Sequence, residues 1–347
     1  MNTFSTTEQQ ILDIIQSDFP LAVRPYQAIG QRIGKTEQDV INILWSLKER
    51  QIIRQISAIF NGKFFGFDTA LISFQIAEHA LERTAQIVNA HPGVSHNYQR
   101  KHPFNLWFTL SVPHALDMTR HVQTLARLSS CSTYLYLPGV KTFKRRVQFD
   151  MTANPTKLEA PSQNSGSPSK MSSKITLSKE IQYSIMDELQ KDLPLISRPF
   201  ADIARQFQIE EEELFQFLAY LKTSQKMSRF AAILYHRNIG YNANVMVVWD
   251  VPEEIVQAFG EYAAEQREIS HCYERVTYPE WPYNFYTMIH GRTHEFTQQV
   301  IDALAGKFQI TSYERLESGK EFKKQSVNYF RDDITVWHRK WVEGKAV

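Results

Sequence analysis

The chain has 347 residues, of which 43% are hydrophobic, enough for two to four domains that each bury a core. Its 39 basic and 37 acidic residues leave a net charge of +2, which argues against the strong positive field typical of nucleic-acid-binding proteins. The two cysteines, Cys131 and Cys272, stand far apart, which argues against a disulfide framework or a cysteine-rich metal site and favours a reducing cytoplasm. The first residues are too polar for a signal peptide, and no stretch approaches the ~20 apolar residues of a membrane span, so we expect neither export nor membrane insertion.

Residues 1–55 are predicted to form a helix-turn-helix unit. Apolar residues recur at helical spacing around Ile11 and again around Val40, and Thr36 is expected to cap the last of three helices. The strand IIRQISAIF follows these helices. This order predicts a winged helix-turn-helix.

Residues 56–150 are predicted to form a ferredoxin-like domain. The segments TALISFQI, VSHNYQR, NLWFTLSV and STYLYL have the composition of strands, and one helix is expected after the first strand and one after the third. The resulting order βαββαβ is that of a ferredoxin-like sandwich.

The second half of the chain repeats this module. DFPLAVRPYQAIG at 18–30 is matched by DLPLISRPFADIA at 192–204, and SHNYQR is matched by SHCYER. We therefore expect an α+β chain built by tandem duplication, with a flexible linker at 151–177, a second helix-turn-helix unit at 178–229, a second ferredoxin-like domain at 230–335 and a C-terminal tail at 336–347.

The helices that would read DNA begin with acidic residues. The second copy has four glutamates at 210–213, and the first copy has Thr-Glu-Gln-Asp at 36–39, where carboxylates suit the helix dipole but repel phosphate. A fused, asymmetric pair also lacks the two-fold symmetry used against palindromic DNA sites. We expect no DNA binding and interpret the helix-turn-helix units as packing and dimerisation elements.

The SHxYxR strands carry the most informative pattern. Alternation along a strand places three side chains of each copy on one face, about 7 Å apart from a rise of ~3.3 Å per residue: His96, Tyr98 and Arg100 in the first copy, and His271, Tyr273 and Arg275 in the second. Arginine binds carboxylates through its planar fork, and histidine can transfer protons or ligate iron near neutral pH.

Polar and aromatic residues are expected to converge beside these rows in the following hairpins. The first copy contributes His102, Asn105 and Trp107, and the second contributes Trp281 and Asn284. His102 has no histidine counterpart in the second copy, which suggests two unequal pockets.

The motifs SHNYQRxHPFNLWFTL and SHCYERxxxPEWPYNFYTMIHG resemble those of the siroheme decarboxylase family, whose two subunit types are sometimes fused into one chain. The architecture is also similar to that of Lrp/AsnC regulators. The resemblance implies removal of two acetate carboxyl groups from siroheme to give 12,18-didecarboxysiroheme, on the route to heme or heme d1. It implies no separate cofactor and no metal of the protein's own, the iron-containing tetrapyrrole being the substrate.

The resemblance also implies roles for individual residues. The catalytic candidates are His96, His271 and His102, and the first two are also candidates to face the substrate iron. The substrate-binding candidates are Arg100, Arg275, Tyr98, Tyr273, Asn105, Asn284 and Trp281. The expected partners are siroheme and its decarboxylated product, with no DNA and no membrane, in an internal pseudo-dimer that either suffices or forms a homodimer.

Several alternatives stay open at this stage. A tetrapyrrole-responsive regulator of Lrp/AsnC type is the second function, and a non-catalytic heme carrier is the third. The cation-rich strands KTFKRR and KEFKKQ either attract a polyanion or are solvated edges. Arg24 and Arg198 are expected to fix helix starts rather than to contact a ligand, and His290 and His294 are not expected to form a metal pair.

Overall fold

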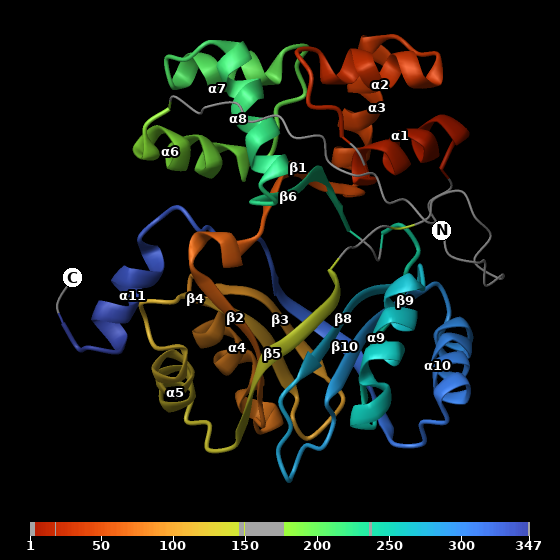
Figure 1. Cartoon of the computed structure of the whole chain (residues 1–347), viewed down its shortest axis with the longest axis vertical. Helices are drawn as coiled ribbons and strands as arrows, with labels where there is room; N and C mark the ends of the chain where they lie inside the picture. The colour runs from red at the N-terminus through yellow and green to blue at the C-terminus, as the bar shows by residue number, and fades with distance from the viewer. Residues whose placement is uncertain (1–3, 18, 146–148, 150–176, 236–237, 346–347) are drawn as a thin grey trace. The chain divides into compact units, whose positions relative to one another are not determined.

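The computed structural model describes residues 4–17, 19–145, 149, 177–235 and 238–345. Apart from Leu177, the predicted linker lies outside the described residues. The chain divides into two compact units, each containing the corresponding parts of both copies (Figure 1). The first unit holds both helix-turn-helix parts, and the second holds both sandwich parts.

The first unit consists of two three-helix groups and a two-stranded antiparallel sheet. Its elements are α1 (Thr6–Ser17), α2 (Pro25–Ile33), α3 (Glu37–Glu49), β1 (Ile53–Phe60) and the 3-10 helix η1 (Gly62–Phe65) in the first copy, and α6 (Lys179–Leu189), α7 (Pro199–Gln206), α8 (Glu211–Thr223) and β6 (Met227–Leu234) in the second. Thr36 caps α3 as predicted, because its hydroxyl accepts from the Asp39 N–H while the Asp39 carboxylate accepts from the Thr36 N–H. Strand β1 pairs with β6, so the strands that form the wings of the two helix-turn-helix parts join the two copies.

The second unit repeats the predicted βαββαβ order in both copies. The first copy contains β2 (Phe67–Phe74), η2 (Glu78–Ala80), α4 (Leu81–Asn89), β3 (Val94–Arg100), β4 (Leu106–Pro113), α5 (Met118–Leu128) and β5 (Tyr134–Arg145). The second contains β7 (Ala243–Trp249), η3 (Glu253–Ile255), α9 (Val256–Glu265), β8 (Ile269–Arg275), β9 (Phe285–Gly291), α10 (His294–Phe308) and β10 (Tyr313–Lys324), followed by α11 (Asp333–Trp341). The predicted fold class is confirmed.

Eight of the described strands close into one barrel in the order β10-β3-β4-β2-β5-β8-β9-β7. Closure depends on β5 and β10, whose two halves pair with different copies. Residues 134–138 of β5 pair with β2, whereas residues 139–145 pair with β8 of the second copy. In the same way, residues 313–317 of β10 pair with β7, and residues 318–324 pair with β3 of the first copy. Each SHxYxR strand therefore lies beside the cation-rich strand of the other copy.

Three apolar clusters fill the second unit. One lies between the first copy's strands and its helices α4 and α5, and a second lies between the second copy's strands and α9 and α10. The third occupies the barrel interior and combines residues of both copies, including Trp107, Leu137, Trp281, Tyr286 and Leu316. Helices therefore cover the outside of the barrel, while its interior side chains come from both sheets (Figure 1).

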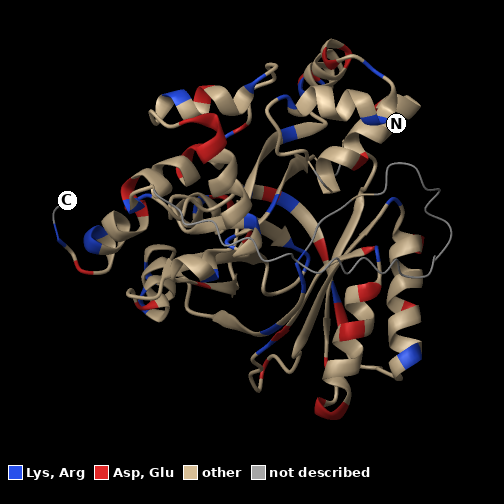
Figure 2. Cartoon of the chain, turned by 45° about the horizontal axis from the view of Figure 1, so that its top comes forward, with Lys and Arg blue, Asp and Glu red and all other residues tan. Residues whose placement is uncertain are grey.

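The domain boundaries differ from the predicted ones. The predicted boundary at 55/56 falls inside β1 and that at 229/230 inside β6, because these strands pair with each other and belong to the first unit, which extends to Phe65 and Gly240. The predicted boundary at 335/336 falls inside α11. Lysines, arginines and acidic residues are interspersed along the ribbon (Figure 2). No helix in the described part of the chain is long and apolar enough to cross a membrane.

Candidate functional site

Both SHxYxR rows face the barrel interior. Tyr98 lies opposite Trp107 on β4, and Tyr273 lies opposite Tyr286 on β9. Directly opposed residues of an antiparallel ladder share a face. Because Trp107 and Tyr286 belong to the interior cluster, the alternate residues of both rows point to the same interior.

Within each row the three side chains lie together, as the strand alternation predicts. The rings of His96 and Tyr98 stack at 6.3 Å between centroids, and the Arg100 guanidinium carbon lies 5.6 Å from the Tyr98 ring centroid. The second row has the same arrangement, with distances of 6.1 Å between the rings of His271 and Tyr273 and 5.0 Å between the Arg275 guanidinium carbon and the Tyr273 ring centroid. Burial raises the pKa of Tyr273, which keeps this phenol protonated.

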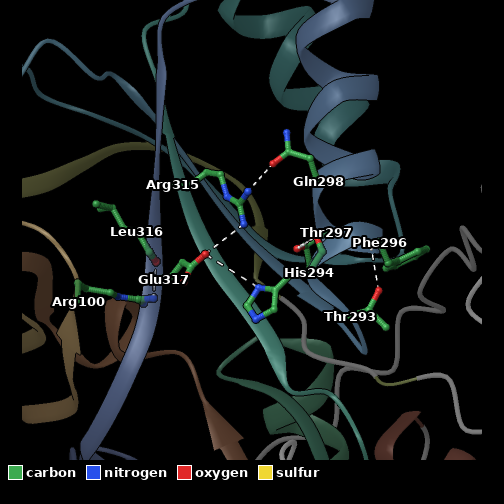
Figure 3. A network of polar contacts seen from close by, with 9 residues as sticks. All are labelled: Arg100, Thr293, His294, Phe296, Thr297, Gln298, Arg315, Leu316 and Glu317. Atoms are coloured by element: carbon green, nitrogen blue, oxygen red, sulfur yellow. Dashed lines mark hydrogen bonds and ion pairs between the residues drawn. The ribbon is translucent and has the colours of Figure 1, made fainter.

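The two arginines are held by equivalent backbone contacts. Arg100 Nη1 donates to the Leu316 carbonyl at 2.8 Å and to Ser318 Oγ at 2.6 Å, and Arg275 Nη1 donates to the Leu137 carbonyl at 2.6 Å. The contact of Arg100 with Leu316 is drawn in Figure 3. Each arginine therefore bonds to a long strand of the other copy, Arg100 to β10 and Arg275 to β5.

These guanidinium groups have spare capacity for an anion. Arg100 is only 5% exposed, and burial lowers its pKa to about 10 and also lowers the pKa of Arg275. Among the described residues neither arginine has an acidic partner, and both Nε atoms are buried without a hydrogen-bond acceptor. A buried cation is costly unless it is paired, so a carboxylate ligand would complete both sites.

The long strands add charged residues that the sequence reasoning did not assign to the site. Lys324 of β10 lies opposite His96, and Arg145 of β5 lies opposite His271. The clustered cations of KTFKRR and KEFKKQ were the available signal, but only the strand exchange reveals which histidine each cation accompanies. We call the row on β3 with its β10 neighbours the first half-site, and the row on β8 with its β5 neighbours the second half-site.

The half-sites differ beside their tyrosines. In the first, the Tyr98 hydroxyl donates to Glu321 Oε2 at 3.1 Å. In the second, the residue opposite Tyr273 is Thr142, which carries no charge. A carboxylate is therefore bonded to the tyrosine of the first half-site, whereas the residue opposite the tyrosine of the second is uncharged.

His102 lies at the other end of the barrel strand from His96. It follows the end of β3, and the four steps from His96 to Arg100 alone span about 13 Å at ~3.3 Å per residue. Its Nε2 lies 3.1 Å from Glu314 Oε2, and its ring packs edge-on against Trp281 at 5.4 Å. The structure thus places His102 beyond the arginine end of the first row, far from His96.

Trp281 and the two asparagines have structural contacts. Trp281 is only 2% exposed and donates its indole N–H to the Tyr286 hydroxyl at 2.6 Å. The Asn105 amide donates to the Ile76 carbonyl and accepts from the Ile76 N–H, and the Asn284 amide does the same with Val251. These contacts favour a role in holding the strand ends over the substrate contact expected from the sequence.

The two histidines of the HGRTH segment point to different partners. His290 Nε2 lies 2.7 Å from Ser270 Oγ, whereas His294 Nδ1 lies 4.0 Å from Glu317 Oε1 in the network around Arg315 (Figure 3). No group of three or more histidine, cysteine or acidic side chains suited to a metal ion occurs in the described part of the chain.

Comparisons with known proteins agree with this architecture. The model of the AsnC-like ligand binding domain matches residues 64–144 and 238–323, and the model of the siroheme decarboxylase NirDL-like HTH domain matches residues 8–54 and 183–227. The chain is 36% identical over 334 residues to a siroheme decarboxylase of Hydrogenobacter thermophilus, covering 96% of this chain and 98% of that protein.

Two solved structures resemble the whole chain. The crystal structure of the siroheme decarboxylase NirDL has a TM-score of 0.71 and 32% identity, and the match covers 98% of this chain and 99% of that one. The same enzyme in complex with an iron-uroporphyrin III analogue gives a TM-score of 0.70, 31% identity and the same coverage. The predicted family is thereby confirmed, and the chain belongs to the siroheme decarboxylases.

Proposed function

We propose that this chain is a carboxy-lyase that removes two acetate carboxyl groups from siroheme to give didecarboxysiroheme. The observation that carries this proposal is the pair of half-sites, each with a histidine, a tyrosine and an arginine that lacks an acidic partner among the described residues. The family relationship supports the identity of the substrate.

Substrate binding follows from the charges of the half-sites. Arg100 and Arg275 would each donate unused N–H groups to a carboxylate of the tetrapyrrole. Arg145 and Lys324, at the ends of the long strands, would attract the remaining carboxylates around its rim. The stacked histidine and tyrosine of one row would then lie against the reacting acetate.

The chemistry requires one proton to replace each CO2 that leaves. A proton first adds to the macrocycle, the bond between the acetate methylene and its carboxylate carbon breaks, and the electron pair passes into the macrocycle, which gives up the added proton again when the methylene carbon is protonated. The methylene carbon then takes up a proton and becomes a methyl group. Histidine is suited to these transfers because it can hold or release a proton near neutral pH. We propose His96 and His271 as the candidates, with no cofactor besides the substrate's own iron.

The first unit supports an enzyme rather than a DNA-binding regulator. The Arg24 guanidinium pairs with Glu37 at the start of α3, and Arg198 pairs with Glu211 at the start of α8. These two arginines are therefore neutralised by acidic residues, which lowers their attraction for phosphate. We propose that the chain binds no DNA, and that Arg24 and Arg198 stabilise the helix-turn-helix units.

The location and assembly follow from the same features. Cys131 and Cys272 are both buried and unpaired, which is consistent with the proposed reducing cytoplasm. The barrel already joins the two copies as a pseudo-dimer, and a further homodimer of the fused chain stays a prediction.

Anaerobic incubation with siroheme tests the proposal. Mass spectrometry of the extracted tetrapyrrole should show loss of one and then two CO2, with no DNA in the reaction. Siroheme that binds and stays intact would indicate a carrier or sensor instead. Salt-sensitive retention of a specific DNA fragment would favour the regulator.

A further inference from the structure

A chain of hydrogen-bonded side chains leads away from His271 in the second half-site. His271 Nδ1 lies 2.8 Å from Ser270 Oγ, which lies 2.7 Å from His290 Nε2. His290 Nδ1 in turn lies 2.6 Å from Asn244 Oδ1. Ser270 is 4% and Asn244 7% exposed, so solvent competes little for these bonds.

The direction of every hydrogen bond in this series follows from Asn244, its last member. Asn244 Nδ2 donates to the Tyr241 carbonyl at 2.7 Å, so its Oδ1 must be the atom that faces His290. An amide oxygen only accepts, and His290 Nδ1 therefore carries a hydrogen. In the neutral ring Nε2 is then an acceptor, and Ser270 must donate to it.

The serine has one hydrogen, which fixes the state of His271. Ser270 also lies 3.4 Å from the Met288 carbonyl, but the 2.7 Å contact with His290 is much the shorter. With its hydrogen directed to His290, the hydroxyl can only accept from His271, whose Nδ1 is then protonated. A neutral His271 consequently holds its lone pair on Nε2.

We infer that Asn244, His290 and Ser270 are positioning residues that orient the His271 ring and hold it in the Nδ1–H tautomer. In this tautomer Nε2 carries no hydrogen and can take a proton or face the iron of the tetrapyrrole. The assignment of the tautomer is independent of the reaction, and its consequence for catalysis rests on the proposed function.

In the described residues of the first half-site there is no equivalent of this relay, the hydrogen-bonded series of Ser270, His290 and Asn244. The ladder positions equivalent to Asn244 and His290 are Thr69 and Ser111, whose hydroxyls bond to each other at 2.8 Å. His96 Nδ1 lies 2.9 Å from Ser95 Oγ, a hydroxyl that can donate or accept by rotation. Among the described residues, Ser95, Thr69 and Ser111 form no series like that of Ser270, His290 and Asn244, so the second half-site is the one prepared for catalysis.

Nitrogen NMR of the histidine rings tests the inference directly. Two-bond proton–nitrogen spectra of histidine-labelled full-length protein distinguish the tautomers, and the His271 signals are assigned by their absence in His271→Gln. We expect the Nδ1–H tautomer for His271 in the wild type and in His290→Gln, whose amide can both donate and accept. His290→Leu and Ser270→Ala, which break the chain at different points, should shift His271 toward the Nε2–H form.

Turnover and a matched control complete the test. With siroheme, His290→Leu should lower kcat by about 10- to 100-fold, the range seen when groups that orient a ligating or catalytic histidine are removed, whereas His290→Gln should recover most of it. Ser111→Ala, at the equivalent place in the first copy, should leave kcat and the His271 tautomer unchanged. An Nε2–H tautomer in the wild type, or one unaffected by Ser270→Ala and His290→Leu, would overturn the inference. The expected tautomers without any wild-type turnover would overturn only the proposed function.

Discussion

Arg145, near the end of β5 in the first copy, lies directly opposite His271 on β8 of the second copy. Lys324 and His96 have the same relationship with the copies reversed. Each histidine therefore depends on the other copy for its neighbouring cation. This dependence gives a physical reason for joining the two copies, since neither copy alone supplies a complete half-site.

Replacing Arg145 by glutamine should raise the KM for siroheme by about tenfold or more, because a charge-assisted hydrogen bond contributes roughly 1.5–3 kcal/mol. The matched control is Lys144→Gln, which removes the same charge from the neighbouring residue. Lys144 Nζ donates to the Gln266 carbonyl beside α9 and lies opposite Cys272 rather than His271. Steady-state kinetics of the two variants check this prediction, and equal changes in KM would show that only net charge matters.

Asn284→Ala should lower the free energy of unfolding by about 1–3 kcal/mol, because it leaves the buried backbone groups of Val251 without their partners. Its KM for siroheme should stay near that of the wild type. Asn105→Ala should behave in the same way, since its contacts with Ile76 are equivalent. Urea denaturation followed by kinetics separates the two roles: an unchanged stability with a raised KM would return both asparagines to the substrate site.

Three histidines outside the half-sites form a buried row under α11. His91 Nδ1 accepts the Gly93 N–H, which directs its Nε2–H to His121 Nδ1 at 2.9 Å, and His121 Nε2 lies 2.8 Å from His338 Nδ1. With the hydrogen bonds in this direction, both ring nitrogens of His91 and both of His121 have a partner while the rings are neutral. Burial lowers the pKa of His121 to about 4 and the pKa of His91 well below its ordinary value.

Acid should therefore destabilise the second unit. The unfolded chain binds protons at His91 and His121 near pH 6.5 and the folded chain does not, so their contribution to stability is complete above that pH and falls as the pH drops from about 6.5 toward 4. His121→Gln should flatten this dependence, and His79→Gln, at an exposed histidine, should not. Urea titrations between pH 4 and 8 provide the measurement; identical slopes for His121→Gln and the wild type would contradict the prediction.

The helix α11 offers a comparison between two tryptophans. Trp337 is 8% exposed and packs on the core of the first copy, with its ring 4.1 Å from that of His91, whereas Trp341 is 40% exposed. Trp337→Ala should cost about 3–5 kcal/mol of unfolding free energy, as large buried side chains do. Trp341→Ala should cost much less. Equal losses in calorimetry would mean that α11 does not dock through Trp337.

Much of the fold could be predicted because it follows from local patterns. Helical spacing, the Thr36 cap and the internal repeat specified both modules and their βαββαβ order. The strand exchange could not be predicted, because β5 and β10 each continue past their own sheet and no local pattern reveals which copy the second half of a strand joins. The boundary predicted at 55/56 differs from the observed one for a related reason, because it falls inside β1, whose partner strand β6 is distant in the sequence.

The candidate site, too, could be predicted only in part from local patterns. Period-two alternation predicted that His271, Tyr273 and Arg275 share a face. It could not show that His102 lies far from His96, since closeness in sequence does not show how far an extended strand carries a residue. The relay through His290 was also missed, because Ser270, His290 and Asn244 come from three strands that only the barrel brings together.

The most direct test of this account is the decarboxylation of siroheme by His271→Ala and His96→Ala beside the wild type, under anaerobic conditions, with mass spectrometry of the tetrapyrrole. We predict that the wild type removes two CO2, that His271→Ala leaves siroheme intact, and that His96→Ala retains most of the activity. Intact siroheme with the wild type under conditions where binding is observed, or loss of activity in His96→Ala with His271→Ala unaffected, would contradict it.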